Sequence, residues 1–473
     1  MKKTLRIEPL DPLLIRDGRP FNRTPGVVAR STSTIAPSVV AGTLRTAMYK
    51  HIQSSCSPSV SKDQIECIRK SITKSVVRGP LHSMYGEVYY PFPQDVDVSE
   101  VDGEIKVHFR RPRTHLNEDE GFLGTDTNSR YTGQLLPVLH AATDKPWPKK
   151  PAFVSASWMT RWLADELTES DWETALQEWS AVCKDRSTAL ETWNQVLANE
   201  RPMQMTSSTH HHQQISAPYF MAAFEHELRT HTAIDEQTYG AKDEHLFGTE
   251  MLVLPEGLSV LAECDLSNVR QEWPEGSLAT IHSMGGKKRL VHIQESLSTQ
   301  VWNCPAELSE KMAENSADRQ CDRTEQLGNG EGDPDPSAIR LERDACYVRM
   351  VLATPAYFAK GWLPRWVNTE TLLTERAGWL ENISLKLVWA CLSDWQPVSG
   401  WSYTENKSKA LRRMVPAGSV YFFKVMEGEP SDLLKHDWLR SVSDANRRKG
   451  AFDKEDGFGL AMWGLWRPNC AEK

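Results

Sequence analysis

The stretches MKKTLRIEPLDPLLIRDGRPF, residues 1–21, and IAPSVVAGTLRTAMYK, residues 35–50, predict how the fold begins. Residues Thr4–Leu10 predict a first strand, which ends where turn-forming residues begin at Asp11. From Pro37 onward, apolar residues recur at steps of three and four, which predicts a helix with one buried face. A strand, a loop that contains arginines and then a helix is a common opening of an α+β domain.

The length of 473 residues corresponds to about three domains of roughly 150 residues, or to two domains with long insertions. Residues 150–200 predict a helical insertion, since tryptophans recur among their apolar positions. Residues 315–338 are polar and rich in glycine, which predicts disorder. We therefore expect a first domain over 1–225 and a second over 226–473, with a further division near 340 and a terminal glycine-rich loop.

Charge is unevenly distributed along the chain. The formal net charge is −8, yet residues 1–50 contain nine Lys or Arg against three Asp or Glu. A basic first segment on an acidic body suits local contact with phosphate groups, while other surfaces meet protein.

The start of the chain does not predict export, because Glu8 and Asp11 interrupt the apolar stretch that a signal peptide needs. The best apolar run, Leu385 to Leu392, contains Lys386 and is too short to span a bilayer. The nine cysteines are an odd, dispersed set without a close pair, which favours reduced, metal-free thiols. We expect a cytoplasmic protein that contacts no membrane.

No local pattern predicts catalysis, and we expect no catalytic residue, no metal and no cofactor. His226 and His231 resemble a zinc-protease pair, but a spacing of five turns the second imidazole about 140° away on a helix. The stretch 284–289 lacks the first glycine and the hydroxyl of a phosphate-binding loop. A dispersed, metal-independent ribonuclease site leaves no local signature, so that alternative stays open.

Three separated segments carry a resemblance. The first comprises residues 10–21 and 35–47, the second runs from 228 through 247, and the third comprises 416–423 and 457–464. In this order they resemble the RAMP superfamily of CRISPR proteins, and within it the family of subunit three of the type III-B Cmr effector complexes. The opening segment is the most specific of the three.

The resemblance implies an α+β fold with two ferredoxin-like (RRM-like) domains that carry helical and loop insertions. It also implies a non-catalytic subunit of a ribonucleoprotein, which binds the repeat-derived 5′ handle of a CRISPR RNA (crRNA). The expected protein partners are the large polymerase/cyclase-like subunit and the other RAMP subunits of the Cmr complex.

Arginines can pair with successive phosphates through their forked donors, and glycines can let RNA lie against the main chain. The candidate RNA-binding residues are Arg16, Arg19, Arg23, Arg30, Arg45, Arg229, His231, Gly457, Phe458 and Gly459.

Two other functions remain open at this point. A crRNA-processing, metal-independent endoribonuclease of the same superfamily would cleave repeat RNA as the isolated chain. A protein-only scaffold would purify without stoichiometric small RNA.

Overall fold

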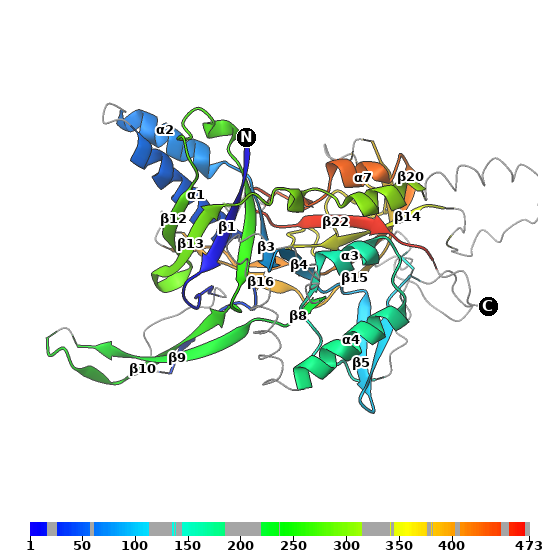
Figure 1. Ribbon diagram of the computed structural model, residues 1–473, viewed down its shortest axis with the longest axis horizontal. Helices are drawn as coiled ribbons and strands as arrows, with labels where there is room; N and C mark the ends of the chain where they lie inside the picture. Colours follow the sequence, from blue (N-terminus) through cyan, green and yellow to red (C-terminus); the bar gives the residue numbers. More distant parts are fainter. Residues whose placement is uncertain are drawn as a thin grey trace, which may run out of the picture.

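The computed structural model describes residues 1–16, 26–56, 61–112, 135–136, 138, 144–184, 219–235, 237–314, 341, 345–375, 380, 382–402, 407–445 and 454–468. Helices and strands are mixed along the chain, which confirms the α+β class (Figure 1).

The first sheet has eight strands in the order β12-β13-β1-β11-β3-β4-β7-β8. All of its neighbouring strands are antiparallel. The strands are β1 (Lys2–Pro9), β3 (Val77–Met84), β4 (Glu87–Pro91), β7 (Phe153–Ser155), β8 (Phe220–Met221), β11 (Leu258–Asp265), β12 (Ala279–Met284) and β13 (Arg289–Glu295).

The helices α1 (Pro37–Ser55) and α2 (Lys62–Thr73) follow β1 in the chain. The apolar residues of α1 that recur at steps of three and four, among them Val40 and Leu44, pack in one core with Leu5 and Ile7 of β1. A capping box in which Ser61 and Gln64 exchange hydrogen bonds begins α2.

A long hairpin, here called the arm, projects from the first sheet (Figure 1). It consists of β9 (Glu225–Ile234) and β10 (Ala241–Val253), and β2 (Val28–Ala29) pairs in parallel with β10. Several of its large apolar side chains are exposed; they are Leu228, Ile234, Tyr239 and Leu246.

A helical insertion carries α3 (Ala156–Leu163) and α4 (Glu169–Lys184), beside the ribbon of β5 (Val96–Val101) and β6 (Glu104–Phe109). One face of α4 accepts hydrogen bonds from alternate backbone N–H groups of β6. The acceptors are Glu169, Glu173 and Gln177, at 2.7, 3.1 and 2.9 Å. Helix α4 thus covers a strand edge that would otherwise be open to pairing.

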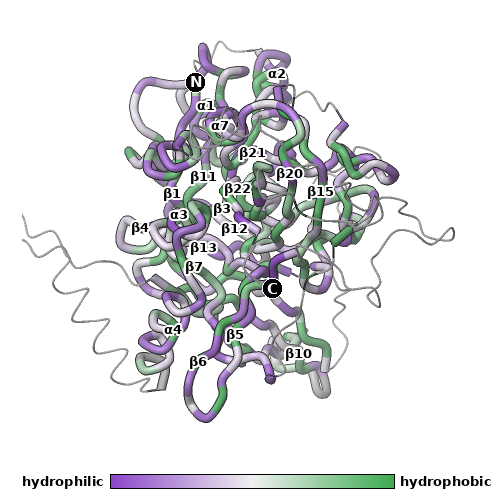
Figure 2. The backbone as a smooth tube through the Cα atoms, turned by 90° about the vertical axis from the view of Figure 1, so that its right-hand side faces the viewer, coloured by the Kyte–Doolittle hydropathy of each residue, from purple (hydrophilic) through white to green (hydrophobic). Residues whose placement is uncertain are grey.

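The second sheet has the order β15-β20-β14-β22-β21 and is likewise antiparallel. Its strands are β14 (Tyr347–Leu352), β15 (Ser384–Cys391), β20 (Val420–Glu427), β21 (Arg440–Ser441) and β22 (Leu460–Leu465), and α7 (Ser431–His436) follows β20. Two small ribbons pair β16 (Gln396–Val398) with β19 (Arg412–Met414), and β17 (Trp401–Ser402) with β18 (Lys407–Ser408). Figure 2 shows hydrophobic stretches along strands in the middle of the molecule and hydrophilic stretches at its periphery.

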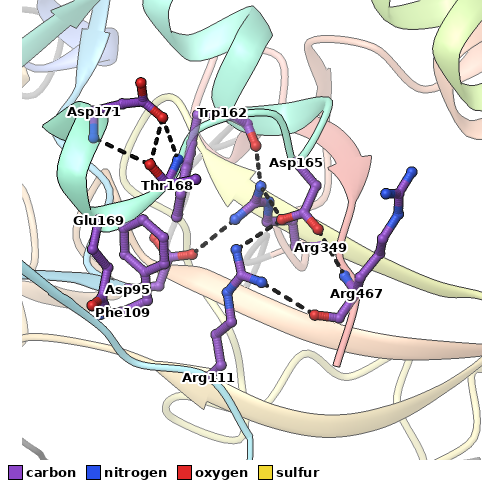
Figure 3. Close-up of polar contacts among 10 residues, drawn as sticks. All are labelled: Asp95, Phe109, Arg111, Trp162, Asp165, Thr168, Glu169, Asp171, Arg349 and Arg467. Carbon is purple, nitrogen blue, oxygen red and sulfur yellow. Dashed lines mark hydrogen bonds and ion pairs between the residues drawn. The ribbon is translucent and has the colours of Figure 1, made fainter. Parts of the chain in front are cut away.

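A buried ionic network joins the second sheet to the insertion (Figure 3). Arg349 of β14 is fully buried and lies 3.3 Å from an Asp95 carboxylate oxygen and 3.4 Å from Asp165. Arg111 donates to the same Asp165 at 2.8 Å. Burial lowers the pKa of Arg349 and raises the pKa of Asp95, so their mutual attraction offsets a desolvation cost.

The first sheet crosses the division expected at residue 225. Strands β11 and β13, beyond that point, flank β1 on either side, because β1 supplies a central strand with two pairing edges. The two sheets are separated instead in the interval that contains residue 340. The expected disordered stretch 315–338 lies outside the described residues, as do residues 185–200 of the helical insertion. Among the helices that the structure describes, none is long and apolar enough to cross a membrane.

Candidate nucleic-acid interface

A histidine and several cationic side chains from two distant segments gather near the base of the arm. We call them the basic cluster: Arg229 and His231 on β9, and Lys287, Lys288 and Arg289 at the turn between β12 and β13. The Lys287 ammonium lies 3.2 Å from His231 Nε2 and 5.5 Å from the centroid of the Phe247 ring. The His231 ring stacks on Phe247 at 5.3 Å with an interplanar angle of 24°. The arrangement combines positive charge with an aromatic surface.

The turn reaches the arm because two glycines let it dock on the loop that follows β1. Gly286 N donates to Leu14 O at 2.7 Å. Gly285 has φ +72°, and a Cβ there would lie 2.6 Å from Leu14 O, so no side chain fits. The next two residues, Lys287 and Lys288, also have positive φ, at 54° and 48°. With this local backbone, the Lys287 ammonium reaches His231 of the arm.

Burial, together with repulsion among the cationic groups of the cluster, lowers the pKa values of His231 and Lys287. The pKa of His231 is lowered by burial first and then by Lys287, Arg289 and Arg229. The pKa of Lys287 is lowered by burial and by Arg289. An anion bound among these groups would relieve this repulsion.

Carboxylates neutralise only part of the cluster. Arg229 pairs with Glu227 at 2.6 Å, and Arg289 lies 4.0 Å from Asp11. Within the described part of the chain, neither Lys287 nor Lys288 has a carboxylate within ion-pair distance. Two lysines of the cluster are therefore available to an external anion.

Two of the predicted arginines lie on the segments beside the arm. Arg16 forms an isolated bridge with Ser31, and Arg30 is exposed directly after β2. Strand β2 pairs Ala29 with Thr249, whose hydroxyl lies 2.8 Å from His231 Nε2. Arg19 and Arg23 lie outside the described residues.

Arg45, predicted to bind RNA, is engaged by other residues of the chain. Its guanidinium lies 2.5 Å from an Asp456 carboxylate oxygen and donates to Ser75 O at 2.8 Å and to Glu455 O at 2.9 Å. These partners occupy its donors inside the protein and tie α1 to the segment around Asp456, while contact of Arg45 with RNA stays a prediction.

The glycine-rich loop also faces inward. Phe458 is fully buried, and Gly459 N donates to Pro355 O at 2.8 Å. Gly457 has φ +91°, and a Cβ there would lie 2.9 Å from Val77 O of β3. The loop thus packs between β3 and the second sheet, and contact of its backbone with RNA stays a prediction.

Lys287, Lys288 and Arg289 were not predicted as binding residues. Three consecutive cations after two glycines are the signal in the sequence that could have indicated them. Lys287 is 56 residues from His231, and only the pairing of the strands reveals that they meet.

The chemistry that this arrangement supports is anion binding with aromatic stacking. Among the described residues, no group of His, Cys, Asp or Glu could hold a metal ion. His231 and Lys287 together also provide a base and a cation, the two groups that metal-independent RNA cleavage requires.

The family model described as CRISPR-associated protein (Cas_Cmr3) matches residues 5–320 and 325–466. Among curated proteins, none matches the chain.

Similar solved structures come from type III CRISPR complexes. A chain of a type III-B Cmr-beta complex bound to cognate target RNA is 13% identical, with 98% of this chain and 99% of that chain covered and a TM-score of 0.40. A chain of Cmr-beta with target RNA and AMPPnP is 12% identical, with coverage of 89% and 86% and a TM-score of 0.37. A chain of the Csm3-Csm4 subcomplex of a type III-A interference complex is 10% identical, with coverage of 98% and 100% and a TM-score of 0.30. Because the family model extends over nearly the whole sequence, the chain belongs to the Cas_Cmr3 family of CRISPR-associated proteins.

Proposed function

We propose that the chain is a non-catalytic, RNA-binding subunit of a type III-B Cmr effector complex, and that the basic cluster holds the repeat-derived 5′ handle of the crRNA. One observation carries the proposal: Lys287 lies against His231 and Phe247, with no carboxylate in ion-pair range among the described residues. Membership of the Cas_Cmr3 family supports the complex to which the subunit is assigned.

Each part of the cluster suits a different part of an RNA strand. Lysine ammonium groups act as point charges toward phosphates, and arginine forks bind phosphate oxygens in pairs. The stacked rings of His231 and Phe247 offer a surface to an unstacked base. Single-stranded RNA needs both kinds of contact.

Protein partners would use other surfaces. The exposed Leu228, Ile234, Tyr239 and Leu246 of the arm support docking on a neighbouring subunit. The proposed neighbours are the large polymerase/cyclase-like subunit and the other RAMP subunits, in the cytoplasm.

We also propose that each sheet is built on a ferredoxin-like unit. In the first sheet, the central order β13-β1-β11-β3 places the fourth, first, third and second strands of such a unit side by side. In the second sheet, the run β22-β14-β20-β15 has the same order. Helix α1 after β1 and helix α7 after β20 occupy the corresponding connections.

A second candidate function rests on the contact between Lys287 and His231. A neutral imidazole next to a cation could deprotonate a ribose 2′-hydroxyl while the cation stabilises the phosphate. Metal-independent cleavage of repeat RNA by the isolated chain, abolished by His231→Ala, would favour an endoribonuclease.

The test of the proposed function is RNA binding by the purified chain across a salt series. Each lost single-strand phosphate contact lowers the slope of log affinity against log salt by roughly 0.7. We expect Lys287→Ala/Lys288→Ala to lower the slope by about 1.4 for a labelled repeat-derived handle. Lys62→Ala/Lys70→Ala, on the exposed face of α2, is the charge-matched control. Equal slopes for the two double variants would contradict the proposal.

A further inference from the structure

The ribbon of β16 and β19 lies over the glycine-rich loop and is fixed to it. Its inner side chains Val398 and Met414 pack in one small core with Phe458. The guanidinium of Arg412 lies 5.3 Å from the centroid of the Phe458 ring. Because this inner face is buried, the ribbon holds whatever its outer face carries in a defined position.

The outer face carries an aromatic ring and a cation in contact. Arg413 pairs with Pro397 across the ribbon, and its guanidinium lies 4.8 Å from the centroid of the Trp395 ring. Trp395 remains 50% exposed although Arg413 covers part of it, and the neighbouring Leu411 is 52% exposed. In the part of the chain that the structure describes, Arg413 has no ion-pair partner.

We propose that Trp395 and Arg413 form a platform that stacks an unpaired base of single-stranded RNA, separate from the basic cluster. This site goes beyond the proposed function, because none of its residues belongs to the cluster.

The chemistry favours nucleic acid over a protein partner. An exposed indole offers a π surface to any base, and the adjacent guanidinium can contact the phosphate beside it. Among the described residues beside the ribbon, Arg413 and Lys409 are exposed cations and Asp394 is an exposed carboxylate. The ribbon exposes Trp395 and Arg413, whereas Phe458 of the glycine-rich loop beneath it is buried.

The test compares two probes with the full-length chain: a short fluorescent oligouridylate and an abasic oligomer with the same backbone. Stacking contributes to binding only when the oligomer carries bases. We therefore expect Trp395→Ala to weaken oligouridylate binding about tenfold and to leave binding of the abasic oligomer unchanged. Trp395→Phe, which retains a ring, should restore most of the affinity. Arg413→Ala should weaken both probes and lower the salt slope by roughly 0.7.

Two control variants remove an exposed apolar side chain and an exposed arginine elsewhere on the chain. Leu297 is fully exposed, and Arg69 is an exposed arginine on α2, so Leu297→Ala and Arg69→Ala should leave both affinities unchanged. The thermal midpoint of each variant shows whether it is folded.

The proposal is overturned if Trp395→Ala leaves oligouridylate binding unchanged, or if both probes lose affinity equally. The first result would mean that Trp395 stacks no base. The second would mean that the surface binds through its charge alone, as an acidic protein partner could also use it. Failure of the unaltered chain to bind oligouridylate would also overturn it. Repeating the series in the Lys287→Ala/Lys288→Ala background separates this site from the basic cluster. If the two sites are independent, the changes in binding free energy add.

Discussion

Arg45 and Asp456 are 411 residues apart in the sequence, yet Arg45 Nη1 lies 2.5 Å from Asp456 Oδ1. The contact ties the first helix to the glycine-rich loop near the end of the chain. Burial of both side chains, 13% and 9% exposed, makes the pair costly to break from one side.

Arg45→Ala should therefore reduce stability without changing RNA contacts. Leaving Asp456 without its partner is expected to cost about 3 kcal/mol, measured by chemical denaturation. Asp456→Ala combined with Arg45→Ala should cost less than the sum of the single changes, because the pair is then removed as a unit. If Arg45→Ala changes the slope of log RNA affinity against log salt and leaves the stability unchanged, Arg45 contacts RNA.

Gly457→Ala should destabilise the protein by more than the backbone strain of its positive φ alone. Gly457 and Gly86 have similar φ, +91° and +86°, but only Gly457 has backbone within 4 Å of its would-be Cβ. Alanine at either position costs about 1 kcal/mol of backbone strain, and at Gly457 the approach to β3 adds to it. The thermal midpoint should fall further for Gly457→Ala than for the control Gly86→Ala. Equal decreases in the thermal midpoint would mean that β3 moves aside without a measurable cost in stability.

The opening strand and first helix could be predicted because their apolar periods are local. The helix prediction from Pro37 agrees with α1, and the strand at 4–10 overlaps β1. The position of β11 between β1 and β3 could not be predicted, since pairing partners more than 170 residues apart leave no local pattern. The same reason applies to the proposed binding site: Arg229 and His231 were predicted as candidates, but Lys287, which contacts His231, was not. The buried ion pair of Arg45 and the close backbone approach at Gly457 could not be predicted either, because their partners lie far away in the sequence.

His82 should make the protein sensitive to acid. Burial between Phe153 and Phe224 lowers its pKa from 6.5 to about 4. Because the pKa is depressed in the folded state, the contribution to stability is complete above about 6.5 and is lost as the pH falls toward 4. The loss amounts to at most about 3 kcal/mol over this window. Denaturation measured from pH 7 to 4 should show it.

The variant His82→Leu keeps the site apolar and removes the titration. Its stability should fall less steeply over the same pH window. Parallel pH profiles for the variant and the unaltered chain would assign the acid sensitivity to other groups.

RNA binding should strengthen as the pH falls, in the opposite direction to stability. In the free chain, burial and then Lys287, Arg289 and Arg229 keep the pKa of His231 low, while Glu227 is engaged by Arg229. A phosphate next to His231 would raise that pKa, so binding takes up a proton and linkage makes the affinity rise on acidification. We expect an increase of about three- to tenfold between pH 7.5 and 5.5 for the labelled handle.

His231→Asn retains hydrogen bonding but cannot be protonated, and it should flatten this dependence. Calorimetry in buffers of different ionisation enthalpy should detect proton uptake by the unaltered chain and not by the variant, with the RNA verified as intact on a gel. If His231→Asn keeps the full pH dependence, the phosphate does not lie against His231, and the handle must contact the chain through residues other than the Lys287–His231 pair.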